Sequence, residues 1–116
     1  MRIGFLGLGQ MGGAMAERLV GGEYDLSVFD PDDAAVERLV SQGASRGNSP
    51  YAVAADRDIV FACLPDPEVS RAVLYGPDGI AAAAPAIYVE MSTIGSPTIE
   101  AIAAALPAET GFLDAP

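Results

Sequence analysis

The sequence predicts an α/β fold built on a doubly wound parallel sheet with helices on both faces. Short apolar segments alternate with segments of helical periodicity along all 116 residues. Apolar residues make up 51% of the chain, which is enough for one core, and the length fits one domain, residues 1–116. Neighbouring parallel strands need long right-handed crossovers, and the alternation supplies a helical segment for each of them.

The first half of the chain predicts three strand and helix pairs. The strands are expected at residues 2–6, 24–30 and 44–47. The helices are expected at residues 11–20, 31–43 and 48–56. The second helix has acids in its first turn, which the helix dipole favours, and Gly43 at its end. The third begins with Ser49 as its cap and Pro50 in its first turn, where proline fits best.

The second half continues the alternation. Strands are expected at residues 57–65, 86–93 and 111–116. Helices are expected at residues 66–76 and 96–106, with a short alanine-rich segment between the first of them and the fifth strand. The run RDIVFACLP is continuously apolar from Ile59 to Leu64 and stops at Pro65. Such a run is typical of a strand covered on both faces.

The turn after the first strand has the pattern G-x-G-x-x-G. We predict that its six residues contact a cofactor: Gly7, Leu8, Gly9, Gln10, Met11 and Gly12. In this pattern the first glycine makes the tight turn, the second admits a pyrophosphate, and the third lets helix and strand pack closely. The N-terminus of the next helix offers free N–H groups and a partial positive charge to the phosphates. A strand before and a helix after favour a Rossmann dinucleotide-binding unit.

Asp30, at the end of the second strand, supports the same interpretation. It lies eighteen residues after Gly12, where a carboxylate can accept hydrogen bonds from the adenosine ribose hydroxyls. A 2′-phosphate about 4 Å away would be repelled by roughly 4 kcal/mol at an effective dielectric near 20. We therefore expect NAD rather than NADP as cofactor. Two alternatives stay open: a strand-end Asp that only opens an Asp-Pro turn, and a glycine-rich turn that binds another ligand or none.

Composition excludes several function classes. The net charge of −10 argues against nucleic acid and anionic lipid as partners, and no apolar run is long enough to span a membrane. All six basic residues are arginine, so the chain has neither the Lys nor the His that most often moves protons near neutral pH. We assign no catalytic residue and no metal ligand within it. The single cysteine, Cys63, is interpreted as a small buried apolar group, and the expected compartment is the cytoplasm.

Three further residues follow strands at the edge where doubly wound sheets bind ligands. Leu64 and Pro65 come after the fourth strand, and Thr93 comes after the fifth, next to Ser92. The residues by themselves leave open whether they contact a ligand or only end a strand and cap a helix.

Several segments together resemble a known family. They are IGFLGLGQMGGAMAERL, LPDPEV, YGPDGI, VEMSTIGSP and the terminal FLDAP, in this order. They are similar to the N-terminal domain of the β-hydroxyacid dehydrogenases, which include 3-hydroxyisobutyrate dehydrogenase, tartronate semialdehyde reductase and, more distantly, 6-phosphogluconate dehydrogenase. The resemblance covers essentially the whole chain and implies cofactor contacts at Leu64, Pro65 and Thr93. Glu90 stands where the family more often has Asp.

The resemblance also implies an activity. Family members transfer a hydride between NAD and a small 3-hydroxy acid or its semialdehyde. They continue past Asp-Ala-Pro into Val-Ser-Gly-Gly and an all-helical domain that carries a catalytic lysine and builds a homo-oligomer. This chain extends to Pro116, so we expect both parts to be absent from it and expect cofactor binding without turnover. The alternatives are a non-catalytic dinucleotide-binding or redox-sensing module, and a domain for another nucleotide.

Overall fold

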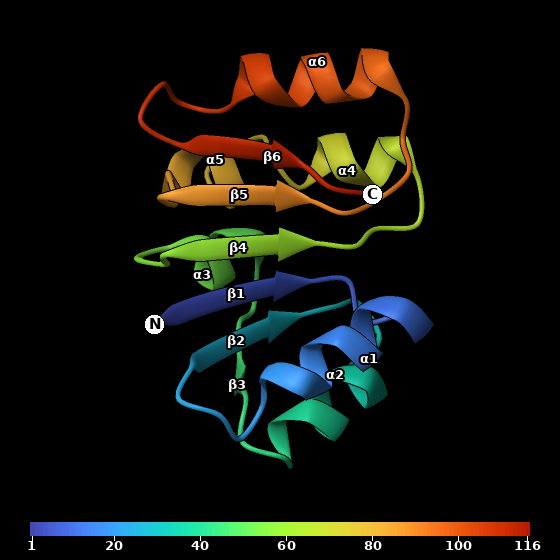
Figure 1. The fold of residues 1–116 in the computed structure, drawn as a ribbon, viewed down its shortest axis with the longest axis vertical. Coiled ribbons are helices and arrows are strands. Elements are labelled where there is room, and N and C mark those ends of the chain that lie inside the picture. The colour runs from blue at the N-terminus through green and yellow to red at the C-terminus, as the bar shows by residue number, and fades with distance from the viewer.

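A computed structural model, which describes residues 1–116, shows a six-stranded parallel sheet with helices on both faces (Figure 1). The strands are β1 (Arg2–Leu6), β2 (Asp25–Phe29), β3 (Ser45–Arg46), β4 (Ile59–Ala62), β5 (Ile87–Glu90) and β6 (Gly111–Asp114). The helices are α1 (Gln10–Leu19), α2 (Asp33–Val40), α3 (Pro50–Ala54), α4 (Pro67–Ala72), α5 (Ile80–Ala83) and α6 (Ser96–Ala105). The predicted fold class is confirmed, and the alanine-rich segment forms the short helix α5.

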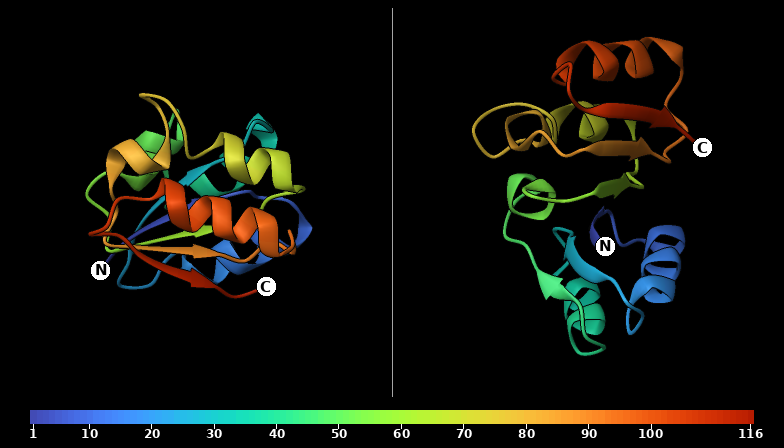
Figure 2. Two further views of the ribbon diagram at one scale, coloured as in Figure 1. Left: turned by 90° about the horizontal axis from the view of Figure 1, so that it is seen from above. Right: turned by 60° about the vertical axis from the view of Figure 1, so that its left-hand side comes forward.

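The sheet order is β3-β2-β1-β4-β5-β6, so the chain starts in the middle and builds outward twice. It first moves from β1 through β2 to β3, then returns to the other side of β1 for β4, β5 and β6. Figures 1 and 2 show α1 and α2 beside the half of the sheet that holds β2 and β3, and α4 and α6 beside the half that holds β5 and β6. A right-handed crossover places its helix on one face of the sheet when the chain moves in one direction, and on the other face when it moves in the opposite direction. The helices are therefore divided between the two faces.

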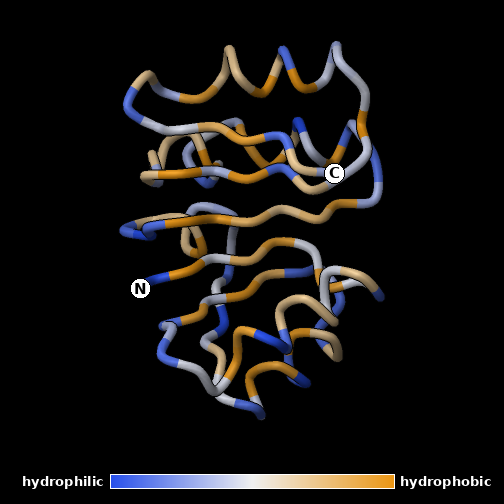
Figure 3. Tube along the Cα trace, in the orientation of Figure 1, coloured by the Kyte–Doolittle hydropathy of each residue, from blue (hydrophilic) through white to orange (hydrophobic).

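Each face carries one core cluster, because successive residues of a strand point to opposite sides. Leu6, Val60 and Tyr88 are fully buried in the cluster under α3 to α6. Phe5 and Val28 belong to the cluster under α1 and α2. Figure 3 shows the corresponding hydrophobic stretches along the strands, with hydrophilic residues gathered in the connections. No helix has the length and apolar character needed to cross a membrane.

The expectation that the fourth strand is covered on both faces is wrong. Val60 and Ala62 are fully buried on the α3 to α6 side, whereas Ile59 and Phe61 on the opposite side are only half-buried. The reason is topological. Helix α1 forms the crossover from β1 to β2, and α2 forms the crossover from β2 to β3. They therefore cover the half of this face that holds β1, β2 and β3, and the half that holds β4, β5 and β6 has no helix over it.

This uncovered surface continues across the two outer strands. The sheet register aligns Ile59 with Ile87, and Phe61 with Val89 and then Leu113. We call the resulting surface the open sheet face, made of Ile59, Phe61, Ile87, Val89, Met91 and Leu113. Ile87 is 40% and Leu113 56% exposed. A hollow of about 480 Å³, lined by residues that include Phe61, Met91 and Leu19, separates this surface from α1.

Candidate functional site

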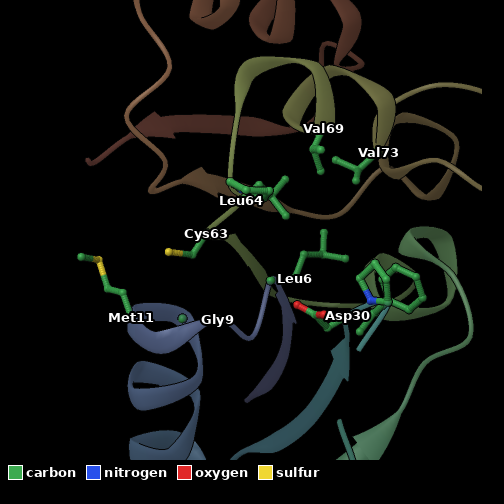
Figure 4. Close-up of a pocket in the computed structure, with 13 residues that line it drawn as sticks. Leu6, Gly9, Met11, Asp30, Cys63, Leu64, Val69 and Val73 are labelled. Carbon is green, nitrogen blue, oxygen red and sulfur yellow. The ribbon is translucent and has the colours of Figure 1, made fainter. Parts of the chain in front are cut away.

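The carboxyl ends of β1, β2 and β4 surround a cavity of about 490 Å³. It lies beside β1, where the strand order reverses, the point at which doubly wound sheets bind ligands. Figure 4 shows its lining residues as sticks. They are Leu6, Gly7, Gly9, Met11, Gly12, Phe29, Asp30, Pro31, Cys63, Leu64, Pro65, Val69 and Val73. Most residues predicted to contact a cofactor are therefore brought together, whereas Leu8, Gln10 and Thr93 do not line this cavity.

The turn from β1 to α1 has no room for side chains at two of its glycines. Gly7 has φ +90°, and a Cβ there would overlap the carbonyl oxygen of Cys63 at the end of β4. A Cβ on Gly12 would overlap the carbonyl oxygen of Gly7. These contacts agree with the tight turn and the close helix packing expected from the sequence. They fix α1 directly over the carboxyl end of β1.

Gly9 differs from its two neighbouring glycines. A Cβ on Gly9 would meet nothing within 4 Å, so the space in front of it is open. Gly9 is the N-terminal cap of α1, and no side chain there accepts a hydrogen bond from the first turn. The backbone N–H groups of the first turn of α1, beginning at Gln10, are therefore available to a ligand. The open space and free donors fit a phosphate group, which a side chain at position 9 would obstruct.

Asp30 ties the second strand to this turn. Its Oδ2 accepts a hydrogen bond from the N–H of Leu8 at 2.7 Å, and its Oδ1 accepts one from the N–H of Asp32 at 2.8 Å. Hydrogen bonds to charged groups contribute about 1.5–3 kcal/mol each. Leu8 thus takes part through its backbone, while its side chain is buried in the core. A carboxylate has about four acceptor sites, so Asp30 can still accept from hydroxyls in the cavity.

The opposite wall of the cavity is apolar and was largely missed by the sequence analysis. Val69 and Val73, from α4 and its C-terminal cap, line it beside Leu64, as Figure 4 shows. Phe29 and Leu6 line the cavity on the side of Asp30. The spacing of Val69 and Val73, four residues apart on one helical face, is the signal that could have found them. The wall suits a flat, apolar ring, opposite the donors and the carboxylate.

Cys63, expected from the sequence to be a small buried apolar group, is less buried than that. It is half-buried and lines the cavity between β4 and the glycine turn. Burial, and after it the negative charge of Glu90, raises the pKa of the Cys63 thiol. A thiol with a raised pKa carries little thiolate near neutral pH, so Cys63 has the environment of an unreactive cysteine.

Thr93 lies at the same edge of the sheet but outside the main cavity. It is exposed and lines a separate hollow of about 380 Å³, together with Gly95 and Asp114. Its neighbour Ser92 is buried and links the two regions, because its Oγ accepts a hydrogen bond from the N–H of Leu64 at 2.7 Å. A ligand that touched both Leu64 and Thr93 would therefore extend from the cavity across the end of β5.

The glycine contacts lead to a prediction for folding. Gly12→Ala should lower the free energy of unfolding by about 1–3 kcal/mol, because its methyl group overlaps the backbone carbonyl oxygen of Gly7. Gly9→Ala is the matched control and should change it by no more than about 0.5 kcal/mol. Urea unfolding followed by circular dichroism measures both. Equal losses of stability for the two variants would contradict the description of this turn.

Comparisons with known proteins agree with this geometry. Residues 2–116 match the NAD binding domain of 6-phosphogluconate dehydrogenase. The cytokine-like nuclear factor N-PAC of Pongo abelii is 33% identical over 118 residues, which is 99% of this chain and 21% of that protein. The 3-sulfolactaldehyde reductase of Escherichia coli (strain K12) is 38% identical over 94 residues, covering 79% of this chain and 32% of that protein.

Among solved structures, Mycobacterium tuberculosis 3-hydroxyisobutyrate dehydrogenase with L-serine is 35% identical, with a TM-score of 0.87. The match covers 99% of this chain and 40% of that chain. Other structures of this fold are complexes with NADP+ in one case and with NAD+ in another. The chain thus spans less than half of the relatives it matches. It belongs to the family of the NAD(P)-binding domain of 6-phosphogluconate dehydrogenase, which has a Rossmann fold and occurs in oxidoreductases.

Proposed function

We propose that this chain is the NAD-binding unit of an oxidoreductase that transfers a hydride between NAD and a small 3-hydroxy acid or its semialdehyde. One observation carries the cofactor part: the cavity combines the open space at Gly9, the free N–H groups of α1 and the Asp30 carboxylate. The substrate class is supported by the resemblance to hydroxyacid dehydrogenases. The proposed compartment remains the cytoplasm, and the single half-buried thiol at Cys63 is compatible with it.

The lining residues divide the work of holding a dinucleotide. The first turn of α1 would receive the pyrophosphate in front of Gly9, and Asp30 would accept hydrogen bonds from the adenosine ribose. Val69 and Leu64 would pack against the adenine ring. The bound cofactor supplies the hydride chemistry, while this chain binds and orients it. The cavity contains no Lys or His, so proton transfer at the substrate oxygen is assigned to a part of the whole protein beyond these residues.

Isothermal titration calorimetry tests the proposed cofactor binding. We expect NAD+ to bind the wild-type chain, and Gly9→Ala to reduce its affinity about tenfold or more, because the methyl group occupies the space for the pyrophosphate. The small effect expected of this variant on stability separates lost binding from lost folding. A wild-type chain that binds neither NAD+ nor NADP+ would favour a domain for another nucleotide.

Asp30 gives a test of cofactor preference. The wild-type chain should bind NAD+ at least about tenfold more tightly than NADP+, because the carboxylate repels a 2′-phosphate. Asp30→Asn keeps the shape and one acceptor oxygen but removes the charge, so it should weaken NAD+ binding and reduce the preference. Asp32→Asn is the matched control, because Asp32 is exposed and does not line the cavity. Tighter binding of NADP+ than NAD+ by the wild type would refute this assignment.

We also propose that, in the whole protein, a further helical domain covers the open sheet face and builds a homo-oligomer. The relatives are two and a half to five times longer than the matched segment, since this segment makes up 40% to 21% of their length. The open sheet face is an apolar surface without a covering helix, with Ile87 and Leu113 exposed. Exposed apolar patches of this kind mark interaction surfaces. Substrate binding and catalysis would then belong to both domains.

This arrangement predicts the behaviour of residues 1–116 alone. Sedimentation velocity at increasing concentrations should show self-association, because the open sheet face remains in contact with water. Leu113→Glu should shift the chain toward the monomer, whereas Tyr75→Glu, at an equally exposed position away from this surface, should not. A wild-type chain that stays monomeric at all concentrations would count against a docking role for this face.

A second candidate is a non-catalytic dinucleotide-binding or redox-sensing module. It is favoured by the similarity to N-PAC, which is named as a cytokine-like nuclear factor. Assays of the whole protein with NAD+ and small 3-hydroxy acids distinguish the two. Turnover supports the oxidoreductase, and cofactor binding without turnover across these acids supports the module.

A further inference from the structure

A buried carboxylate lies directly behind the apolar wall of the cavity. Glu90, the last residue of β5, is fully buried, on the face of the sheet that α4 covers. Its Oε1 accepts a hydrogen bond from the Tyr88 hydroxyl at 3.0 Å, and its Oε2 accepts one from the Ser70 hydroxyl of α4 at 3.2 Å. Ser92, two residues further along the chain, lowers the pKa of this carboxyl through its hydroxyl and its backbone N–H. No arginine takes part.

Such a group is costly unless it is fully hydrogen-bonded. Taking an ionised carboxylate out of water without a cation is strongly unfavourable, and only a complete set of donors offsets the cost. Burial raises the pKa of the Glu90 carboxyl, while the hydrogen bonds from Ser92, Tyr88 and Ser70 act in the opposite direction. A leucine would fill the same volume without this cost. The carboxylate therefore calls for a role other than packing.

Ser70 and Ser92 connect the end of β5, where Glu90 lies, to two segments that line the cavity. Ser92 follows Glu90 by two residues, and its Oγ accepts the hydrogen bond from the N–H of Leu64. Ser70 lies on α4, one residue after Val69, which lines the cavity. Glu90 thus joins the helix α4 to the end of β5, and Ser92 joins the loop after β4 to the residues that follow β5. These are the two segments that carry Leu64 and Val69 into the cavity.

We propose that Glu90 is a positioning residue for the dinucleotide cavity. Its carboxylate orients the Ser92 hydroxyl so that the oxygen can accept from the N–H of Leu64. The hydrogen bond from Ser70 to the same carboxylate fixes the position of α4 against the sheet. This inference rests on the proposed dinucleotide binding and adds a residue that does not touch the ligand. In hydrogen-bonded networks of this kind each member polarises the next, so the acceptor at Leu64 depends on the carboxylate behind it.

The first test cuts the link at Ser92. Ser92→Ala removes the acceptor of the Leu64 N–H and should lower NAD+ affinity about tenfold in titration calorimetry, the upper range for one hydrogen bond. It should also shift the amide proton resonance of Leu64 in the ligand-free chain. Ser92→Thr restores the hydroxyl and should restore both properties to within about twofold. Ser92 also lines the hollow of about 380 Å³ that Thr93 borders.

The second test addresses Glu90 itself. Glu90→Gln keeps the volume but removes the charge, so it should lower NAD+ affinity about threefold to fivefold and shift the Leu64 resonance in the same direction as Ser92→Ala. The matched control is Ile102→Val. Ile102 is fully buried in the same core but does not line the cavity, so this variant should lower the melting temperature and leave the affinity within about twofold.

The outcomes separate this inference from the proposed function. If Ser92→Ala and Glu90→Gln bind NAD+ like Ile102→Val, with affinity unchanged, the positioning role is wrong although the cofactor assignment stands. If Ser92→Ala has its effect and Glu90→Gln leaves both affinity and the Leu64 resonance unchanged, Ser92 acts alone and the assignment of Glu90 is overturned. If the wild-type chain does not bind NAD+ or NADP+, the proposed function fails, while the Leu64 resonance still tests the connection from Glu90 to the loop.

Discussion

The close approach of the β1–α1 turn to β4 is the contact on which the rest of the site depends. Gly7 and Gly12 have no space for a side chain, because their α-carbons face the carbonyl oxygens of Cys63 and Gly7. This contact sets α1 over the end of the sheet and leaves its first turn uncapped beside the cavity. The same residues thus provide backbone packing and a donor surface for anions, which explains why glycine is required for both.

The second constraint is the placement of charge in a small, mostly apolar cavity. Asp30 lies across from Leu64 and Val69, and its carboxylate is already held by the N–H groups of Leu8 and Asp32. A carboxylate fixed in this way keeps its position whether or not a ligand is present, so little order has to be gained on binding. Glu90 plays the complementary part on the inner side of the wall. Its carboxyl group does not line the cavity, and the hydroxyl groups of Tyr88 and Ser70 donate hydrogen bonds to it.

The helices cover the two faces of the sheet unevenly. One face is complete under α3 to α6, whereas the other is complete only under α1 and α2. Ile87 and Leu113 therefore remain in contact with water in residues 1–116. A relative of this fold is two and a half times longer. The open sheet face and the cavity lie at different places on the sheet, so covering the first need not block the second.

The sequence by itself determined the features that depend on neighbours along the chain. Alternating periodicity predicted the strands and helices, the cap at Ser49 forms with its hydroxyl accepting from Ala52, and the glycine spacing located the turn at Gly7. Only the tertiary structure decided which face of β4 stays open, because that depends on the direction of each crossover. It also brought Glu90 to Ser70 of α4 and separated Thr93 from the main cavity. The contact between Ser70 and Glu90 joins residues that are twenty positions apart, and a local pattern of residue types cannot predict a contact over that separation.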